Sequence, residues 1–102
     1  MSRPEKIRIL GKPFKVLWPE SIEHDGDSDI VGLSDPDAQQ ITVKSTIALE
    51  MAQDALLHEV MHSVEASMGL DLEDTVIERL ATGLLAVIKD NPGFVAYLRK
   101  KT

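Results

Sequence analysis

Two of the three histidines in this chain, His58 and His62, lie four residues apart, and Glu59 directly follows the first. On a helix this His-Glu-x-x-His pattern places both imidazoles on one face, one turn apart, where they can reach one metal ion. Glu59 flanks that face, so its carboxylate can take a proton from a metal-bound water. Zinc suits this set because it accepts imidazole nitrogen, undergoes no redox chemistry and lowers the pKa of its bound water toward 7. The spacing therefore predicts zinc at His58 and His62, with Glu59 as the catalytic base.

A catalytic zinc ion needs a third protein ligand, and Glu78 is the predicted one. It follows His62 by sixteen residues, and a second helix that folds back after Gly69 would return it over the histidines. Thr75-x-x-Glu78 is also a capping-box pattern, in which Glu78 would instead bond to the backbone at the helix start.

Other acidic residues near the motif are alternatives to Glu78 as the third ligand. Glu65 lies one turn beyond His62 on the same helix, a position better suited to a hydrogen bond with a ligand. Glu73 is close enough in sequence to bind. Asp71 and Asp74 are close enough as well, but the helix dipole favours them as carboxylates at the start of the second helix.

The residues before the motif have the alternation of short strands. Residues 6–18 alternate apolar and polar positions at both ends, and Gly11-Lys12 and Pro13 interrupt the middle, which predicts two strands joined by a turn. Their shared inner face would carry Ile7, Ile9, Phe14, Val16 and Trp18. After an acidic loop over residues 20–29, residues 30–33 and the β-branched residues 41–43 predict a third and a fourth strand.

The apolar spacing then changes to three and four residues, which is typical of helices. The first helix is predicted to begin at Ser45 or Thr46 and to end at Ser67 or Met68, before Gly69. Its apolar stripe would be Leu49, Ala52, Leu56, Val60 and Val64. A second helix should begin within residues 71–75 and end at Asp90, and residues 94–101 predict a short last helix.

Strands followed by helices indicate an α+β fold. The expected architecture is a single domain over residues 1–102, in which a small sheet of three or four strands precedes the motif helix. A second, antiparallel helix and a short C-terminal helix follow it. The exposed edge at residues 30–33 is a candidate site for strand addition by a peptide.

Composition excludes several classes of protein. The chain has 102 residues, a net charge of −6 and no cysteine, so disulfides and iron–sulfur clusters are absent, and general nucleic-acid binding is disfavoured. No apolar run approaches the roughly 20 residues of a membrane span, and no signal peptide is visible at the start, so a cytoplasmic protein is expected. The series that begins at Asp25 fails as a calcium loop, because Ile30 and Pro36 stand where Gly and Glu are needed.

At these residues the chain resembles the gluzincin-type zinc peptidases, in which a Glu from a following helix completes His-Glu-x-x-His. More narrowly, it looks like very small phage and prophage proteins with this motif, related to the minimal cores of the ImmA/IrrE-like and SprT-like families. Residues 41–92 carry the likeness, about half of the chain. The resemblance implies a minimal zincin-like metallopeptidase that hydrolyses a peptide or protein substrate, with Zn²⁺ at His58, His62 and Glu78 and with Glu59 as general base and acid.

Two positions depart from the gluzincin pattern. Many gluzincins carry an Asp four residues after the third-ligand Glu, to orient a histidine, but this chain has Thr82 there. Asp54 or Asp71 could take that part. No donor for the developing oxyanion stands at a recognisable position, and Tyr97, Arg79 and His24 are the remaining candidates. These departures keep open a second function, a zinc-stabilised binding or assembly protein without turnover.

Overall fold

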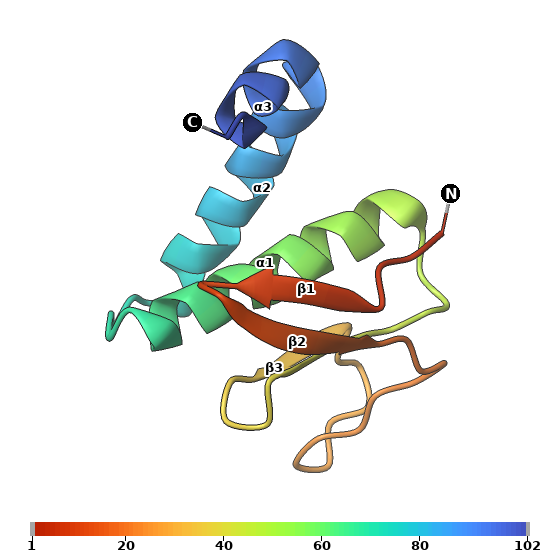
Figure 1. Ribbon diagram of the computed structural model, residues 1–102. Coiled ribbons are helices and arrows are strands. Elements are labelled where there is room, and N and C mark those ends of the chain that lie inside the picture. Colours follow the sequence, from red (N-terminus) through yellow and green to blue (C-terminus); the bar gives the residue numbers. More distant parts are fainter. Residues whose placement is uncertain (1, 102) are drawn as a thin grey trace.

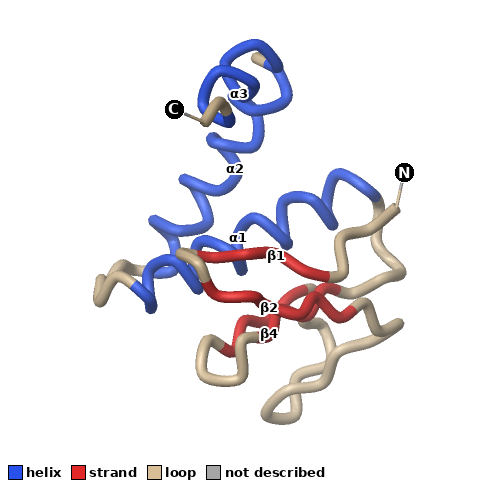
Figure 2. Tube along the Cα trace, in the orientation of Figure 1, coloured by secondary structure: helices blue, strands red, loops and turns tan. Residues whose placement is uncertain are grey.

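A four-stranded mixed sheet forms the first part of the chain. The computed structural model describes residues 2–101. The strands are β1 (Lys6–Ile9), β2 (Lys12–Leu17), β3 (Gly32–Asp35) and β4 (Gln40–Val43), in the order β1-β2-β4-β3. Strand β4 pairs parallel with β2 and antiparallel with β3, and β1 pairs antiparallel with β2 (Figures 1 and 2). Three helices follow, so the predicted α+β fold is confirmed.

The turn between β1 and β2 lies at Leu10 and Gly11 rather than at residues 11–13. Both residues have positive φ, 49° and 82°, which is the requirement of the two-residue hairpin turn that matches strand twist. The chain therefore re-enters the sheet at Lys12, opposite Ile9. The predicted inner face is confirmed. Ile9, Phe14 and Val16 are buried with Ile41 and Val43, and Ile7 and Trp18 pack against them.

Strand β3 begins two residues later than predicted, because its far end is fixed by the turn into β4. The Asp35 carboxylate accepts a hydrogen bond from the Ala38 N–H at 3.1 Å, so the turn begins at Asp35. Strand β3 then runs from this turn back to Gly32, which pairs with Val43.

Helix α1 (Leu49–Ser67) packs across one face of the sheet (Figure 1). The prediction that it begins at Ser45 or Thr46 was wrong, because both residues bond instead to the segment where β2 leads into the acidic loop. The Thr46 hydroxyl donates to the carbonyl of Glu20, and the Ser45 N–H donates to the carbonyl of Pro19. Gly69, with φ 68°, follows the end of the helix as predicted.

The most buried face of α1 differs from the predicted stripe. Its buried residues are Ala52, Ala55, Glu59 and Ser63, whereas Leu49 is 67% exposed. The later residues of the predicted stripe, Leu56, Val60 and Val64, are only partly buried against the core. Helix α1 also packs against β3 and α2. Its most enclosed face is therefore the one that carries Glu59.

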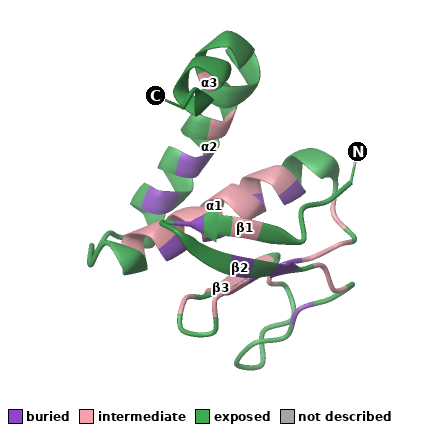
Figure 3. Ribbon diagram, viewed as in Figure 1, coloured by how far each residue is buried: buried purple, intermediate pink, exposed green. Residues whose placement is uncertain are grey.

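Helices α2 (Asp74–Asp90) and α3 (Pro92–Arg99) complete the chain. Helix α2 begins and ends where the sequence predicts. Helix α3 begins at Pro92, two residues earlier than predicted, since proline is favoured in the first turn of a helix. Figures 1 and 3 show α2 rising away from the sheet, with α3 packed at its far end. None of the helices over residues 2–101 combines the length and apolar character needed to cross a membrane.

Candidate metal centre

Three potential ligand atoms converge where α1 meets the start of α2. His58 and His62 lie one turn apart on α1, and their Nε2 atoms are 3.0 Å apart. The first residue of α2, Asp74, places Oδ1 2.8 Å from Nε2 of His62 and 3.4 Å from Nε2 of His58. Within residues 2–101, His58, His62 and Asp74 form a group that could hold a metal ion.

The distances within this group fit a small tetrahedral cation. Zinc bonds of 2.0–2.1 Å require ligand atoms about 3.3 Å apart in a tetrahedral site. The three observed separations, 2.8, 3.0 and 3.4 Å, lie close to that value. The donors are two imidazole nitrogens and one carboxylate oxygen, which zinc accepts and which leave one position open.

Glu65 fixes the orientation of His62. Its Oε1 lies 3.2 Å from Nδ1 of His62, and its other oxygen accepts the N–H of Leu72 in the loop before α2. We assign the Nδ1 proton to this contact, which leaves Nε2 of neutral His62 as a bare lone pair. Glu65 therefore contacts both His62 and the loop before Asp74, which is the hydrogen-bonding role that the sequence suggested for it.

The convergence of these atoms fits a bound cation. With its proton on Nδ1, His62 presents a lone pair 2.8 Å from a carboxylate oxygen of Asp74, and two acceptors at that distance repel. A cation bound between the three atoms would relieve all three contacts, so the arrangement is compatible with a metal site.

Glu59 lies beside the histidines and is 8% exposed. Burial raises the pKa of its carboxyl above the ordinary value, against the opposing effects of His58, His62 and a hydrogen bond from Ser34. Strand β3 closes over it. A Cβ added at Gly32 would lie 3.0 Å from Oε2 of Glu59. The glycine therefore makes room for the carboxylate, which lies largely out of contact with water.

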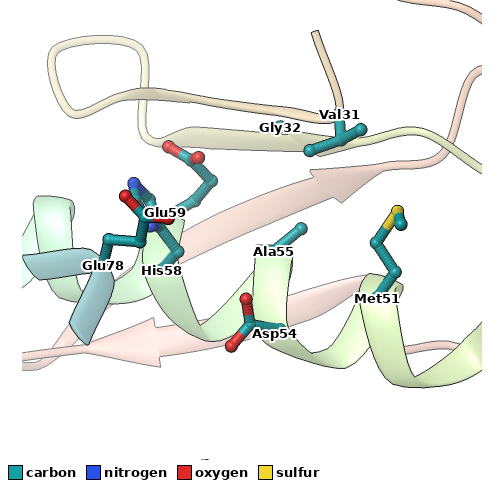
Figure 4. Close-up of a pocket in the computed structure, with 8 residues that line it drawn as sticks. All are labelled: Val31, Gly32, Met51, Asp54, Ala55, His58, Glu59 and Glu78. Carbon is teal, nitrogen blue, oxygen red and sulfur yellow. The ribbon is translucent and has the colours of Figure 1, made fainter. Parts of the chain in front are cut away.

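A cleft of about 280 Å³ opens next to the metal group (Figure 4). Its lining residues are Val31, Gly32, Met51, Asp54, Ala55, His58, Glu59 and Glu78. They come from β3 and the residue before it, from α1 and from α2, so the cleft lies between the sheet edge and the two helices. Acidic side chains line it, and no lysine or arginine of residues 2–101 does so.

The structure brings most of the predicted site residues to this place. His58, His62 and Glu59 lie together as predicted. Glu78 lines the cleft from α2 beside His58 (Figure 4), but it is not part of the three-residue group found within residues 2–101. That Glu78 binds the metal is untested by this arrangement and stays a prediction. The capping alternative was wrong, because α2 begins at Asp74, which leaves Thr75 inside the first turn.

Asp74 is the third member of the candidate metal group, and it is one of the acids that the sequence analysis left as alternatives to Glu78. The sequence interpretation of Asp74 as a helix-start carboxylate is also correct, since it is the first residue of α2. The two readings are compatible, because a side chain at the start of α2 points back to the end of α1 across the short loop.

The other predicted helpers do not contact the histidines in the roles that the sequence suggested. Thr82 donates a hydrogen bond to Asp54 at 2.8 Å, so these two residues join α2 to α1 rather than orient a histidine. None of the three candidate oxyanion donors, Tyr97, Arg79 and His24, lines the cleft.

Comparisons with family models, with curated proteins and with solved structures find no match for this chain.

Proposed function

We propose that this chain is a zinc-dependent metallopeptidase of minimal zincin type, with His58 and His62 as ligands and Glu59 as general base. We propose Asp74 as the third ligand. The observation that carries the proposal is the convergence of three acceptor atoms on one point, beside a buried carboxylate and an open cleft. The resemblance to gluzincins and to small phage proteins with this motif supports the same reading.

The parts of the site divide the chemistry between them. Zinc, when bound, would supply a Lewis acid that polarises a carbonyl and acidifies water. Glu59 is placed to accept the proton of the attacking water and to deliver it to the leaving amine. Its raised pKa suits the first of these steps, because a carboxylate with a higher pKa is a stronger base. Glu65 keeps the His62 ring in the tautomer that a metal needs.

Strand β3 offers a place for the substrate. It pairs with β4 on one side and lies at the end of the sheet order, so its other edge is open to an extended peptide. Val31 and Gly32 line the cleft next to Glu59. A peptide paired with this edge would bring its backbone carbonyls toward the metal group, and the acidic lining would favour basic side chains over acidic ones.

A specific observation favours the second candidate function, a zinc-stabilised binding or assembly protein. No lysine, arginine or tyrosine lines the cleft within the described residues, so an oxyanion would have no donor from this chain besides the metal. In that function the metal would serve to join α1 to α2, and Glu59 would transfer no proton.

The test compares the wild-type chain with Glu59→Gln, which has the same shape and cannot act as a base. Protein purified without added zinc is analysed for metal and then incubated with a mixed peptide library. We expect equal zinc content in both proteins and peptide cleavage by the wild type alone. Zinc in both proteins with no cleavage by either would overturn the peptidase and support the binding protein. Absence of bound metal from both would overturn both functions.

A further inference from the structure

Helices α2 and α3 expose several large apolar side chains that the rest of the described chain does not cover. On α2, Leu80, Leu84 and Val87 follow the i, i+4, i+7 spacing of one face, and they are 52%, 43% and 44% exposed. This face lies beside the buried residues Ile77 and Ala81, which pack on the α1 side. On α3, Phe94, Tyr97 and Leu98 are also exposed. We call these two stripes together the α2–α3 surface.

The position of α3 shows that this surface lacks a cover within the described chain. Over residues 2–101, α3 packs only against α2, and the outer part of α2 stands clear of the sheet (Figures 1 and 3). An eight-residue helix is marginal in water without tertiary packing. Further packing of its exposed apolar side chains, against a surface other than α2, would therefore stabilise α3.

Gly83 marks the centre of the α2 stripe. It lies near the middle of α2 (Asp74–Asp90), where glycine costs a helix about 1 kcal/mol relative to alanine. A Cβ at this position would meet nothing within 4 Å, so packing inside the chain does not require a glycine here. A glycine at the middle of an apolar helix face does allow a second backbone to approach closely.

The charges along this part of the chain are self-complementary in one direction. Residues 71–78 hold four acids and no base, whereas residues 79–101 hold five bases and one acid. Three of these bases, Arg99, Lys100 and Lys101, lie at and after the end of α3. Two copies of the α2–α3 pair packed antiparallel would place the acidic start of α2 in each copy against the basic end of α3 in the other. A parallel pair would oppose like charges, so the pattern favours the antiparallel arrangement.

The exposed apolar area approaches what a dimer needs. At about half exposure, the six side chains of the α2–α3 surface leave on the order of 600 Å² of surface, and one partner contributes about 800 Å², polar and apolar together, to an interface of standard size. We propose that a second copy of this chain covers the α2–α3 surface, as a two-fold antiparallel dimer whose α2 helices cross at Gly83. This dimer does not depend on the peptidase function.

The antiparallel arrangement has a consequence for the metal centre. The metal group lies at the start of α2, and the two-fold crossing brings the far end of the second copy toward that start. The basic end of the second copy, residues 99–101, then approaches a cleft whose lining includes no lysine or arginine.

The first test measures mass in solution by sedimentation equilibrium on the full chain. We expect twice the 11.3 kDa of one chain at micromolar concentrations, and Leu84→Glu should give the monomer with an unchanged circular dichroism spectrum. Leu17→Glu is the matched control. Leu17 is 42% exposed on β2, against 43% for Leu84, and its variant should remain dimeric. A wild-type monomer, or a dimer that Leu84→Glu leaves intact, would overturn the proposal.

A second test addresses the crossing point. The chain has no cysteine, so a single introduced thiol reports on its own position. Under mild oxidation Gly83→Cys should form a disulfide-linked dimer, whereas Ala66→Cys, on the exposed end of α1, should not. A dimer in solution that Gly83→Cys fails to cross-link would show that the helices do not cross there.

Discussion

The identity of the third ligand can be decided by two substitutions of equal size. Asp74→Asn and Glu78→Gln each remove one negative charge and keep the shape of the side chain. Asp74 lies 2.8 and 3.4 Å from the two histidine nitrogens, whereas Glu78 lines the neighbouring cleft one turn further along α2. We therefore expect Asp74→Asn to weaken zinc binding far more than Glu78→Gln.

The expected magnitudes follow from these positions. Loss of an outer hydrogen-bonding partner costs about 10–100-fold in metal affinity, and loss of a direct ligand should exceed that range. For Asp74→Asn this means more than ~2.7 kcal/mol of binding free energy. A carboxylate about 6 Å from a dication in water contributes roughly 1.4 kcal/mol. Glu78→Gln should therefore cost tenfold at most.

The assay is a competition titration with a zinc chelator of known affinity, monitored at one pH for the wild type and both variants. Circular dichroism before each titration checks that α2 still forms. A loss in Glu78→Gln equal to or greater than that in Asp74→Asn would refute the reasoning from the three-atom group. It would then support Glu78 as the ligand, as the sequence predicts.

Three further substitutions test single contacts. Glu65→Gln should weaken zinc binding about 10–100-fold in the same titration, because it disturbs the partner of His62; an unchanged affinity would contradict that role. Gly32→Ala should lower peptide cleavage by up to about 10²-fold with zinc content unchanged, since its Cβ displaces the carboxylate of Glu59; a wild-type rate would contradict this. Glu59→Gln should raise the melting temperature of metal-free protein at neutral pH. Burial raises the pKa of Glu59 in the folded state, so its ionised form costs stability above that pKa, and the cost disappears below the unfolded pKa. A difference in melting temperature that stays constant as the pH falls would contradict it.

Local patterns in the sequence predicted most of the fold. Alternation located β1 and β2, the β-branched residues 41–43 located β4, and Gly69 located the end of α1. The errors came where a local signal has two uses. Ser45 and Thr46 are good helix caps, but they bond to the carbonyls of Pro19 and Glu20 instead, and that choice depends on a loop distant in sequence.

The same distinction applies to the site. His58, Glu59 and His62 lie on one helix, so their spacing alone was enough to place them together. The carboxylate from α2 is different, because Asp74 and Glu78 lie on successive turns and the loop decides which of them reaches the histidines. That loop is held by the contacts of Glu65 with His62 and Leu72. Their geometry is tertiary, and sequence spacing does not contain it.

The most buried face of α1 differs from its predicted apolar stripe. This difference is informative because polar residues occupy buried positions near the site. The most enclosed face of the helix carries Glu59 and, one turn later, Ser63, whose hydroxyl is buried without a hydrogen-bond partner. A chain of 102 residues has a thin core, and burying these polar groups lowers its stability. Natural sequences depart from such rules mainly at functional sites.

The apolar face of α2 departs from the opposite rule, since Leu80 and Leu84 are exposed where a polar surface is expected. The two proposals give both departures one physical explanation, a binding partner that the single chain does not supply. For α1 the proposed partner is a cation, which His58, His62 and Asp74 could hold beside the buried Glu59. For α2 the proposed partner is a second copy of the chain, because acids lie at the start of α2 and bases lie at the end of α3. Each partner would bind the folded chain and not the unfolded chain, and would therefore stabilise the fold. This added stability would offset the cost of burying Glu59 and Ser63 on α1 in a protein with so small a core.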